Sequence, residues 1–365
     1  MIGLRIRGVA LALAAPALAF LIAAVLVTAL LAATGDDVGA FWDVMLAWPA
    51  NRQLTTILNE TAILYLAGIA AAIGFRMNLF NIGVEGQYRV GAFAAAWFAG
   101  EAWLPGKLNT VAAILLAMVV GALWAGIAAV LRVTRGVSEV ISTIMLNAIA
   151  GLLVAYFFNK TAVEAGLSEA TKQVPESGWL DGFQLFGDSP VRLHTLALLA
   201  IVVGVAFGVV LSRTRFGFDL RATGHSETAA VAAGVNVKRM VVYSMLLSGA
   251  VAGLIGMPVL FGQAHNYGTT FETGIGFAGI AVALLGRNNA VGVAFGAAIF
   301  ALLNNQGNAL NITAGISPHI VAVTQGIIVL AVVVAYELVR RYRVRIEQAA
   351  VAAQVAERPV EAVTS

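Results

Sequence analysis

The chain has 365 residues, of which 60% are hydrophobic and 11% are charged, and its formal net charge is +3. Soluble globular domains carry about 25% charged residues, so this composition excludes a water-soluble protein. It indicates an all-α, polytopic transmembrane helix bundle. The apolar runs are long rather than alternating, which excludes a transmembrane barrel. The absence of cysteine excludes disulfides, thiolate catalysis and cysteine metal sites.

Apolar runs predict about ten helices, and most have the roughly 20 residues needed to cross a hydrocarbon layer. The first run is too long for the core of a signal peptide, so we expect a retained helix. The eighth is short and Gly-rich, so we expect it to be broken, tilted or buried in the bundle. The expected helices cover residues 9–33, 54–74, 83–104, 109–131, 138–158, 193–212, 240–262, 273–286, 290–311 and 315–336.

Basic residues are distributed unequally between alternate connecting segments. If the N-terminus is cytoplasmic, the inner segments hold sixteen Lys and Arg residues and the outer segments hold five, with Arg89 unassigned. The positive-inside rule therefore predicts that both termini are cytoplasmic. We divide the chain into a transmembrane domain, residues 1–342, and a cytoplasmic tail, residues 343–365. The Ala/Val/Glu-rich end of this tail is typical of a frayed helix or a disordered segment.

The two halves of the chain share a short pattern. Residues 82–86 read IGVEG after the second expected helix, and residues 275–279 read IGFAG after the seventh. With five helices in each half, the copies would have opposite orientation, as in inverted-repeat transporters. Chance similarity in a Gly-rich chain is the alternative.

The stretch 74–91 places polar side chains where the second helix leaves the membrane and the third begins. Amide and ionisable groups at membrane depth are costly unless they are paired, and they often line a pathway. Alternatively, Glu85 pairs with Arg89 at helical i,i+4 spacing, or the amides cap helix ends. The candidate pathway residues here are Asn78, Asn81, Glu85 and Gln87.

A second group of amides lies in the ninth expected helix. So many amides in a membrane helix need partners, and hydrogen bonds between helices are the usual answer. They would also suit a polar solute with several hydroxyls or ring nitrogens. This group adds Asn304, Asn305, Gln306 and Asn308 to the candidate pathway, and the fifth helix adds Asn147, for which a structural role is the alternative.

The longest polar, basic segment between two apolar runs is the loop 213–239. Its Arg and Lys residues place it at the cytoplasmic face. Within it, Ser226 can cap a two-turn helix, and Glu227 adds negative charge to the first turn. Gly234 can adopt the left-handed conformation that ends a helix. A short Ala-rich helix is marginal in water, so we expect it to dock on a partner; an ordinary connector is the alternative.

Several other patterns carry no chemistry. Residues 274–279 match G-x-G-x-x-G, but no strand precedes them and no acidic residue follows about 20 positions on. No phosphate-binding loop is present, so the chain has no ATP site of its own that we can recognise. The four histidines lack metal-ligand spacing. We therefore expect no catalytic residues, no bound cofactor and no metal.

Three motifs resemble one family. Residues 221–236, RATGHSETAAVAAGVN, resemble the cytoplasmic coupling loop of bacterial ABC importer permeases in the branched-chain amino acid and simple-sugar permease family. Residues 78–87, NLFNIGVEGQ, resemble the nucleoside subgroup, which works with basic-membrane-protein-type lipoproteins. Residues 138–147 and 274–286 also fit this subgroup. The resemblance covers roughly residues 55–340.

The resemblance implies a multi-pass permease subunit in the bacterial plasma membrane that imports nucleosides. It would not be an enzyme, because cytoplasmic ABC ATPase subunits would bind and hydrolyse ATP with Mg²⁺. Its partners would be these ATPases, a second permease subunit, identical or homologous, an extracytoplasmic solute-binding lipoprotein and the small-molecule solute, with no nucleic acid. The matching motif assigns ATPase coupling to Arg221, Gly224, Ser226, Glu227, Ala229, Ala230 and Gly234.

Two other functions compete with nucleoside import. A simple-sugar importer would have the same architecture, and the pathway amides favour neither cargo. An ion-coupled secondary transporter would work without ATPases and normally needs a membrane carboxylate, for which Glu85 is the candidate.

Overall fold

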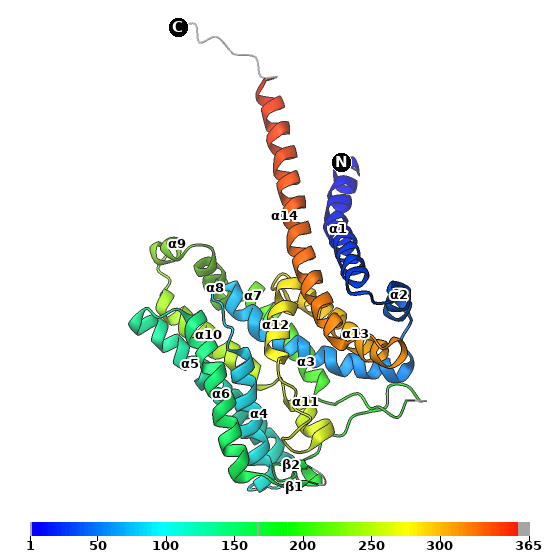
Figure 1. The fold of residues 1–365 in the computed structure, drawn as a ribbon. Coiled ribbons are helices and arrows are strands. Elements are labelled where there is room, and N and C mark those ends of the chain that lie inside the picture. The colour runs from blue at the N-terminus through cyan, green and yellow to red at the C-terminus, as the bar shows by residue number, and fades with distance from the viewer. Residues whose placement is uncertain (1, 166–167, 188, 357–365) are drawn as a thin grey trace. The chain divides into compact units, whose positions relative to one another are not determined.

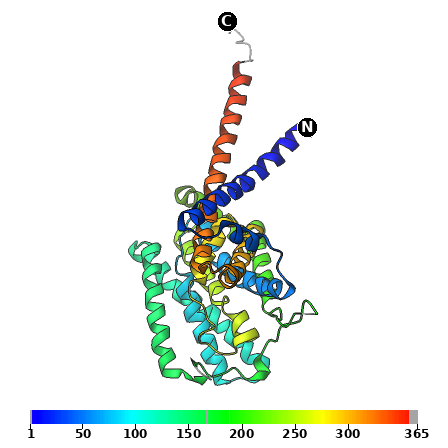
Figure 2. The ribbon, with the colours of Figure 1, turned by 45° about the vertical axis from the view of Figure 1, so that its right-hand side comes forward.

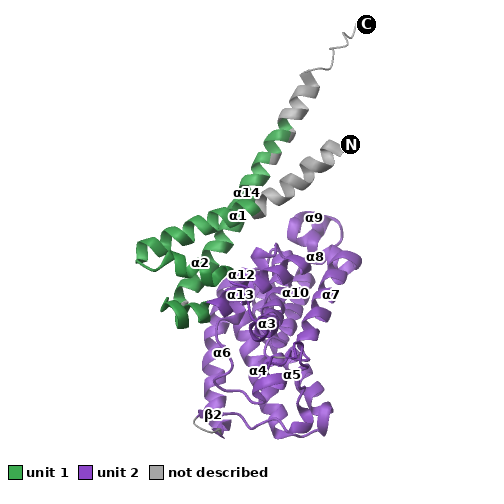
Figure 3. Ribbon diagram, turned by 90° about the vertical axis from the view of Figure 1, so that its right-hand side faces the viewer, with its two compact units in different colours: residues 1–46, 307–365 green, residues 47–306 purple. Residues whose placement is uncertain are grey.

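The computed structural model describes residues 2–165, 168–187 and 189–356. These form two compact units, residues 1–46 with 307–365 and residues 47–306 (Figure 3). Within the described ranges, seven helices are long and apolar enough to cross a membrane, or eight if one bent pair forms a single span. The chain is therefore a polytopic helical membrane protein, as its composition predicts. The end of the expected tail, residues 357–365, lies outside the described residues.

The first unit contains the two ends of the chain. Its α1 packs against α14, and the indole of Trp42 on α2 donates a hydrogen bond to Thr28 Oγ1 at 3.0 Å. Residue 342 does not end a helix, because α14 continues to Ala356. The division into a domain 1–342 and a tail 343–365 stays a prediction. The helices of this unit are α1 (Ile2–Thr34), α2 (Val38–Leu46), α14 (Pro318–Ala356) and the last turns of α13 (Ala290–Ala314).

The second unit is a bundle in which α4, α5 and α6 run side by side (Figures 1 and 2). Its core is formed by α3 and by the segment from α10 to η2, since 72% of the most apolar window of each is buried, against 28% for α5 and for α6. Its longer helices are α3 (Asn51–Arg76), α4 (Val84–Glu101), α5 (Gly106–Arg135), α6 (Glu139–Thr161), α7 (Ala197–Arg213), α8 (Arg215–His225), α10 (Val237–Gly253), α12 (Ile275–Leu285) and most of α13.

Glycines allow the core helices to approach closely. A Cβ at Gly121 on α5 would lie 2.3 Å from the carbonyl oxygen of Gly249 on α10, and the reverse substitution would meet the same obstacle. A Cβ at Gly279 on α12 would lie 2.6 Å from the carbonyl carbon of Ala67 on α3. These contacts join backbone to backbone, as small residues do in membrane bundles.

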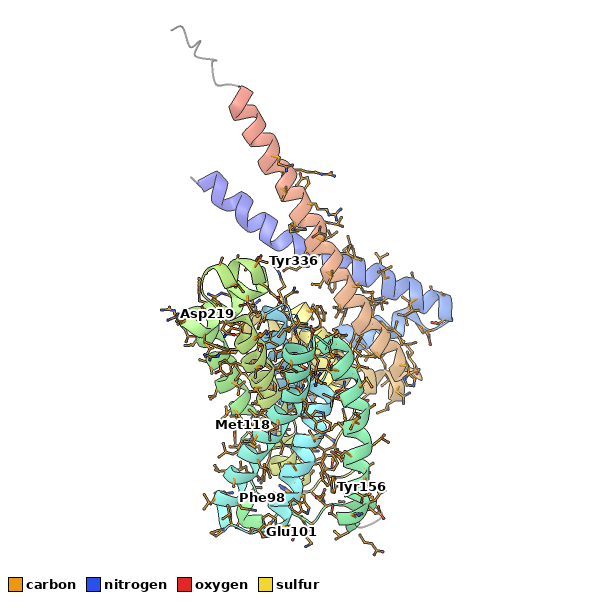
Figure 4. All side chains as sticks on the ribbon, turned by 90° about the vertical axis from the view of Figure 1, so that its left-hand side faces the viewer. Phe98, Glu101, Met118, Tyr156, Asp219 and Tyr336 are labelled. Carbon is orange, nitrogen blue, oxygen red and sulfur yellow. The ribbon has the colours of Figure 1, made fainter. Side chains whose placement is uncertain are left out.

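The short elements lie at opposite ends of this unit. At one end, α8 and α9 (Glu227–Ala232) form a helical hairpin; at the other, β1 (Val163–Ala165) pairs antiparallel with β2 (Ser168–Ala170) (Figure 1). Figure 4 shows Asp219 of α8 at the end opposite Phe98, Glu101 and Tyr156. The remaining short helices are η1 (Glu176–Gly178), α11 (Met257–Val259) and the π-helix η2 (Leu260–Ala264).

Each of the ten apolar runs contains a helix, and α9 lies where a short helix was expected, but α2 and α8 were not expected. Helix α8 lies in a polar, basic stretch that has no apolar run, and it bends 75° away from α7. It begins where Thr214 Oγ1 accepts the backbone N–H of Gly217 at 3.0 Å, as an N-cap does. The seventh expected helix, 240–262, is extended by α11 and η2 to Ala264.

Candidate functional site

The α8–α9 hairpin has the local structure that its sequence predicts. Ser226 caps α9, because its Oγ accepts the N–H of Ala229 at 3.3 Å. Gly234 follows the helix with φ +82°, a conformation that favours glycine. Ala230 is buried, whereas Glu227 and Ala229 are exposed. The hairpin therefore has a fixed shape and presents an exposed face.

The hairpin rests directly on the turn between α3 and α4. A Cβ at Gly224 would lie 2.3 Å from the carbonyl oxygen of Arg76 and 3.1 Å from Met77 Cα. Glycine at this position thus lets α8 touch the backbone at the end of α3. Arg221 lies one turn earlier on α8, and its charge acts on Arg76.

An ionic bridge makes a second connection between the hairpin and this turn. The guanidinium of Arg132, at the end of α5, contacts Glu227 at 3.6 Å and also pairs with Glu139 at the start of α6. The other oxygen of Glu139 accepts the backbone N–H of Phe80 at 3.2 Å. Because Glu139 is buried and Glu227 is exposed, Arg132 connects the surface of the hairpin to the interior.

Within this turn, Asn81 is the centre of a buried hydrogen-bond network. Its amide nitrogen donates to Gln87 Oε1 at 3.0 Å and to Ser248 Oγ of α10 at 2.8 Å. Its carbonyl oxygen accepts from Gln87 Nε2 and from the N–H of Gly83, both at 3.0 Å. Ser248 in turn donates to the carbonyl of Ala70 on α3 at 2.6 Å. The network joins α3, α4 and α10.

Glu85 caps the N-terminus of α12. Its two carboxylate oxygens accept the backbone N–H groups of Gly274 and Gly276, each at 2.9 Å. These N–H groups have no partner within their own helix, and the carboxylate also complements the positive end of the helix dipole. The carboxylate of Glu85 therefore binds the start of α12, in place of the Glu85–Arg89 pair that the sequence offered as an alternative.

Asn147 on α6 binds the backbone at the start of α4. Its Oδ1 accepts the N–H of Gly86 at 2.9 Å, and its Nδ2 donates to the carbonyl of Ile82 at 3.0 Å. Asn78 differs from the other polar residues of the stretch, since it is exposed and has φ +57°. Four predicted pathway residues, Asn81, Glu85, Gln87 and Asn147, thus bind other parts of the chain. That they also line a solute pathway stays a prediction.

The amides of α13 contact other parts of the chain than that network does. Asn304 donates to the carboxylate of Glu60 on α3. Gln306 is buried and donates to the carbonyl of Ala47 at 3.1 Å. Asn305 has a buried Oδ1 with no hydrogen-bond partner among the described residues, and Asn308 is exposed in the first unit.

At the opposite end of the second unit, the loop 171–180 packs on residues 261–267. The indole of Trp179 stacks on the imidazole of His265, with ring centroids 3.9 Å apart. Burial lowers the pKa of His265, and the charge of Asp181 opposes this in part. Burial, followed by the charge of His265, also lowers the pKa of His194. This loop therefore has a defined local structure.

The sequence did not single out four residues on which these contacts depend, namely Glu60, Arg132, Glu139 and Ser248. Glu60 could have been noticed as a carboxylate inside an apolar helix. Glu139 belongs to the motif 138–147, but its partners lie 7 and 59 positions away. Ser248 carries no signal, because serine is common in membrane helices.

Comparison with known proteins agrees with these motifs. The family described as branched-chain amino acid transport system / permease component matches residues 53–335. The chain belongs to this family. The match includes the α8–α9 hairpin, the α3–α4 turn and the capped helix α12, so the contacts at the hairpin end described above lie within the matched residues.

Curated relatives of this permease are similar over nearly their whole length. A glucose ABC transporter permease protein from Haloferax volcanii is 34% identical over 87% of this chain and 86% of its own. A guanosine ABC transporter permease protein from Bacillus subtilis is 34% identical over 82% and 84%. A nucleoside ABC transporter permease protein from Lactococcus lactis is 31% identical over 78% and 80%. The chain is thus a permease subunit of the ABC transporter type.

Proposed function

We propose that this permease imports nucleosides across the bacterial plasma membrane, with both termini in the cytoplasm. The contacts of the α8–α9 hairpin are the observation that supports the mechanism. A force on α9 would reach the α3–α4 turn through the close contact at Gly224 and through the Arg132–Glu139 bridge. From that turn it would reach α10 through Asn81 and α12 through Glu85.

The partner that applies this force is a cytoplasmic ABC ATPase, which binds and hydrolyses ATP with Mg²⁺. The exposed residues of α9, with Ser226 and Gly234 fixing its ends, are its docking site. A second permease subunit completes the pathway, and an extracytoplasmic lipoprotein delivers the solute. Rigid-body rocking of the helices then alternates access to the two sides.

Nucleosides are favoured as cargo because two of the relatives above are named for guanosine and nucleoside transport. A simple sugar is the second candidate, because the relative from Haloferax volcanii is named for glucose. An ion-coupled carrier is disfavoured, because both oxygens of Glu85 accept backbone N–H groups and this residue is only 4% exposed.

Uptake by the reconstituted transporter tests this proposal. Proteoliposomes containing the permease, its second permease subunit, its ATPase and its lipoprotein should accumulate labelled guanosine in the presence of ATP. They should accumulate less labelled glucose under the same conditions. Replacing Glu227 with Lys should abolish uptake, whereas Lys238→Gln, a change to an exposed residue outside α9, should preserve it. Uptake by the permease without an ATPase would refute the proposal, and preference for glucose would refute the cargo.

A further inference from the structure

A groove of about 850 Å³ lies between α7 and α13 on the second unit. Each helix contributes one face, with lining positions that recur every three to four residues. The phenol of Tyr65 on α3 also lines it. Most lining atoms are apolar, and several of these side chains are exposed, among them Val205, Val291 and Phe295. In a membrane-spanning chain such a surface meets lipid or another helix.

The groove is about as deep as one leaflet. On α7 it runs from Gly204 to Arg213, and on α13 from Ala290 to Ala298. At 1.5 Å per residue, each helix therefore contributes about 12–14 Å. Half of a hydrocarbon layer of about 30 Å is about 15 Å. One acyl chain from a single leaflet matches this length, whereas a partner's transmembrane helix would extend well beyond the groove, so the length of the groove favours a lipid.

The two ends of the groove differ in charge. Ser212 and Arg213 lie at the end near the α8–α9 hairpin, and both are exposed. No ion pair of Arg213 is present among the described residues. The deeper walls carry valine, alanine, glycine and phenylalanine. At its deep end, Gly204 leaves room for Tyr65, since a Cβ there would lie 1.9 Å from the phenolic oxygen.

We infer that this groove binds a phospholipid from the leaflet on the hairpin side, with an acyl chain along the apolar walls and the headgroup phosphate at Arg213. A basic residue at the membrane surface beside a groove between helices suits an anionic headgroup. The bound lipid is an anionic phospholipid such as phosphatidylglycerol. This inference does not depend on the cargo or on the ATPase.

Native mass spectrometry of the delipidated full-length permease tests the inference, with dimyristoyl phosphatidylglycerol and phosphatidylethanolamine as probes. The wild type should retain one phosphatidylglycerol and prefer it about fivefold over phosphatidylethanolamine, as one basic contact would provide. Arg213→Gln should remove this preference. Ala294→Leu should reduce retention of both lipids by filling the groove, and Leu is a good helix former.

Two matched variants control for general effects. Ala148→Leu adds the same bulk at an exposed position of α6, and Arg135→Gln removes a charge at the end of α5; both should behave as the wild type. Equal lipid retention by wild type and Ala294→Leu would overturn the inference. So would a loss of permease dimers in Ala294→Leu with lipid retention unchanged, because the groove would then be a protein interface.

Discussion

The carboxylate of Glu85 accepts the backbone N–H of Gly276 at 2.9 Å, across 191 positions of sequence. A Cβ at Gly276 would lie 2.3 Å from the backbone nitrogen of Glu85, so the two peptides are in direct contact. They belong to the two similar pentapeptides, IGVEG and IGFAG, at the starts of α4 and α12. The pentapeptides therefore meet in space, although the inverted repeat itself stays a prediction.

Replacing Glu85 with Gln should destabilise the permease. Glutamine retains one carbonyl oxygen, but its amide group would face a backbone N–H, so one buried donor at α12 would lose its acceptor. Such a loss costs about 1–3 kcal/mol. The unfolding temperature in detergent should therefore fall. Glu176→Gln, at an exposed carboxylate, should leave it unchanged; equal melting of the two variants would contradict the capping role.

Replacing Arg132 with Gln should uncouple transport from ATP hydrolysis. The change leaves the buried carboxylate of Glu139 without its cation and breaks the connection to Glu227. We expect a stability loss of about 1–3 kcal/mol, and a larger loss of uptake than of ATP hydrolysis in the reconstituted transporter. The ratio of the two rates is the measurement.

The control for this variant is Arg135→Gln, which removes a charge from the same last turn of α5. It should keep the wild-type ratio of uptake to hydrolysis. If Arg132→Gln folds and keeps that ratio too, the bridge plays no part in coupling.

Replacing Gly224 with Ala should displace the α8–α9 hairpin. The new Cβ would lie 2.3 Å from a backbone oxygen of Arg76, which cannot move aside as a flexible side chain can. Overpacking of this kind costs about 1–3 kcal/mol. We expect weaker co-purification of the ATPase. Gly326→Ala on α14, where a Cβ would meet nothing within 4 Å, should have no such effect.

Acidification should loosen the end of the second unit that carries Trp179. The pKa of His265 and the pKa of His194 both lie below the ordinary value of 6.5, chiefly because burial disfavours the charged imidazole. The unfolded chain therefore binds more protons as the pH falls below about 6.5. The stabilisation is complete above that pH and is lost as the pH falls through the folded pKa values.

Thermal melts between pH 7.5 and 5, followed by tryptophan fluorescence, measure this effect. His265→Asn keeps a residue that tolerates the left-handed φ of +56° but removes one titrating group. Its melting temperature should depend less on pH than that of the wild type. An unchanged pH dependence would show that His265 does not contribute.

The sequence predicted the helices that depend on local composition. Apolar runs located α3, α5 and α6 to within a few residues, and the pattern from Ser226 to Gly234 located the short helix α9. Helix α8 was not predicted, because its residues are polar and basic and its amphipathic packing on the α3–α4 turn is a tertiary effect. Propensity alone does not reveal such a helix.

The site was predicted as a set of residues but not as a set of contacts. Asn81, Glu85 and Asn147 were selected because polar groups at membrane depth need partners, and each has them. The partners include a serine on α10 and backbone N–H and carbonyl groups, which no sequence pattern marks. Glu85 has an arginine four positions on, so local spacing favoured a pair that the long-range contact with α12 replaces.

The contact between Gly121 and Gly249 limits how this permease can be altered. Neither position accepts a side chain, and α5 and α10 cannot slide past one another without a steric collision. We therefore expect α5 and α10 to move together as one rigid body. Any redesign of what the permease carries has to reshape the surfaces around this seam and leave the seam itself untouched.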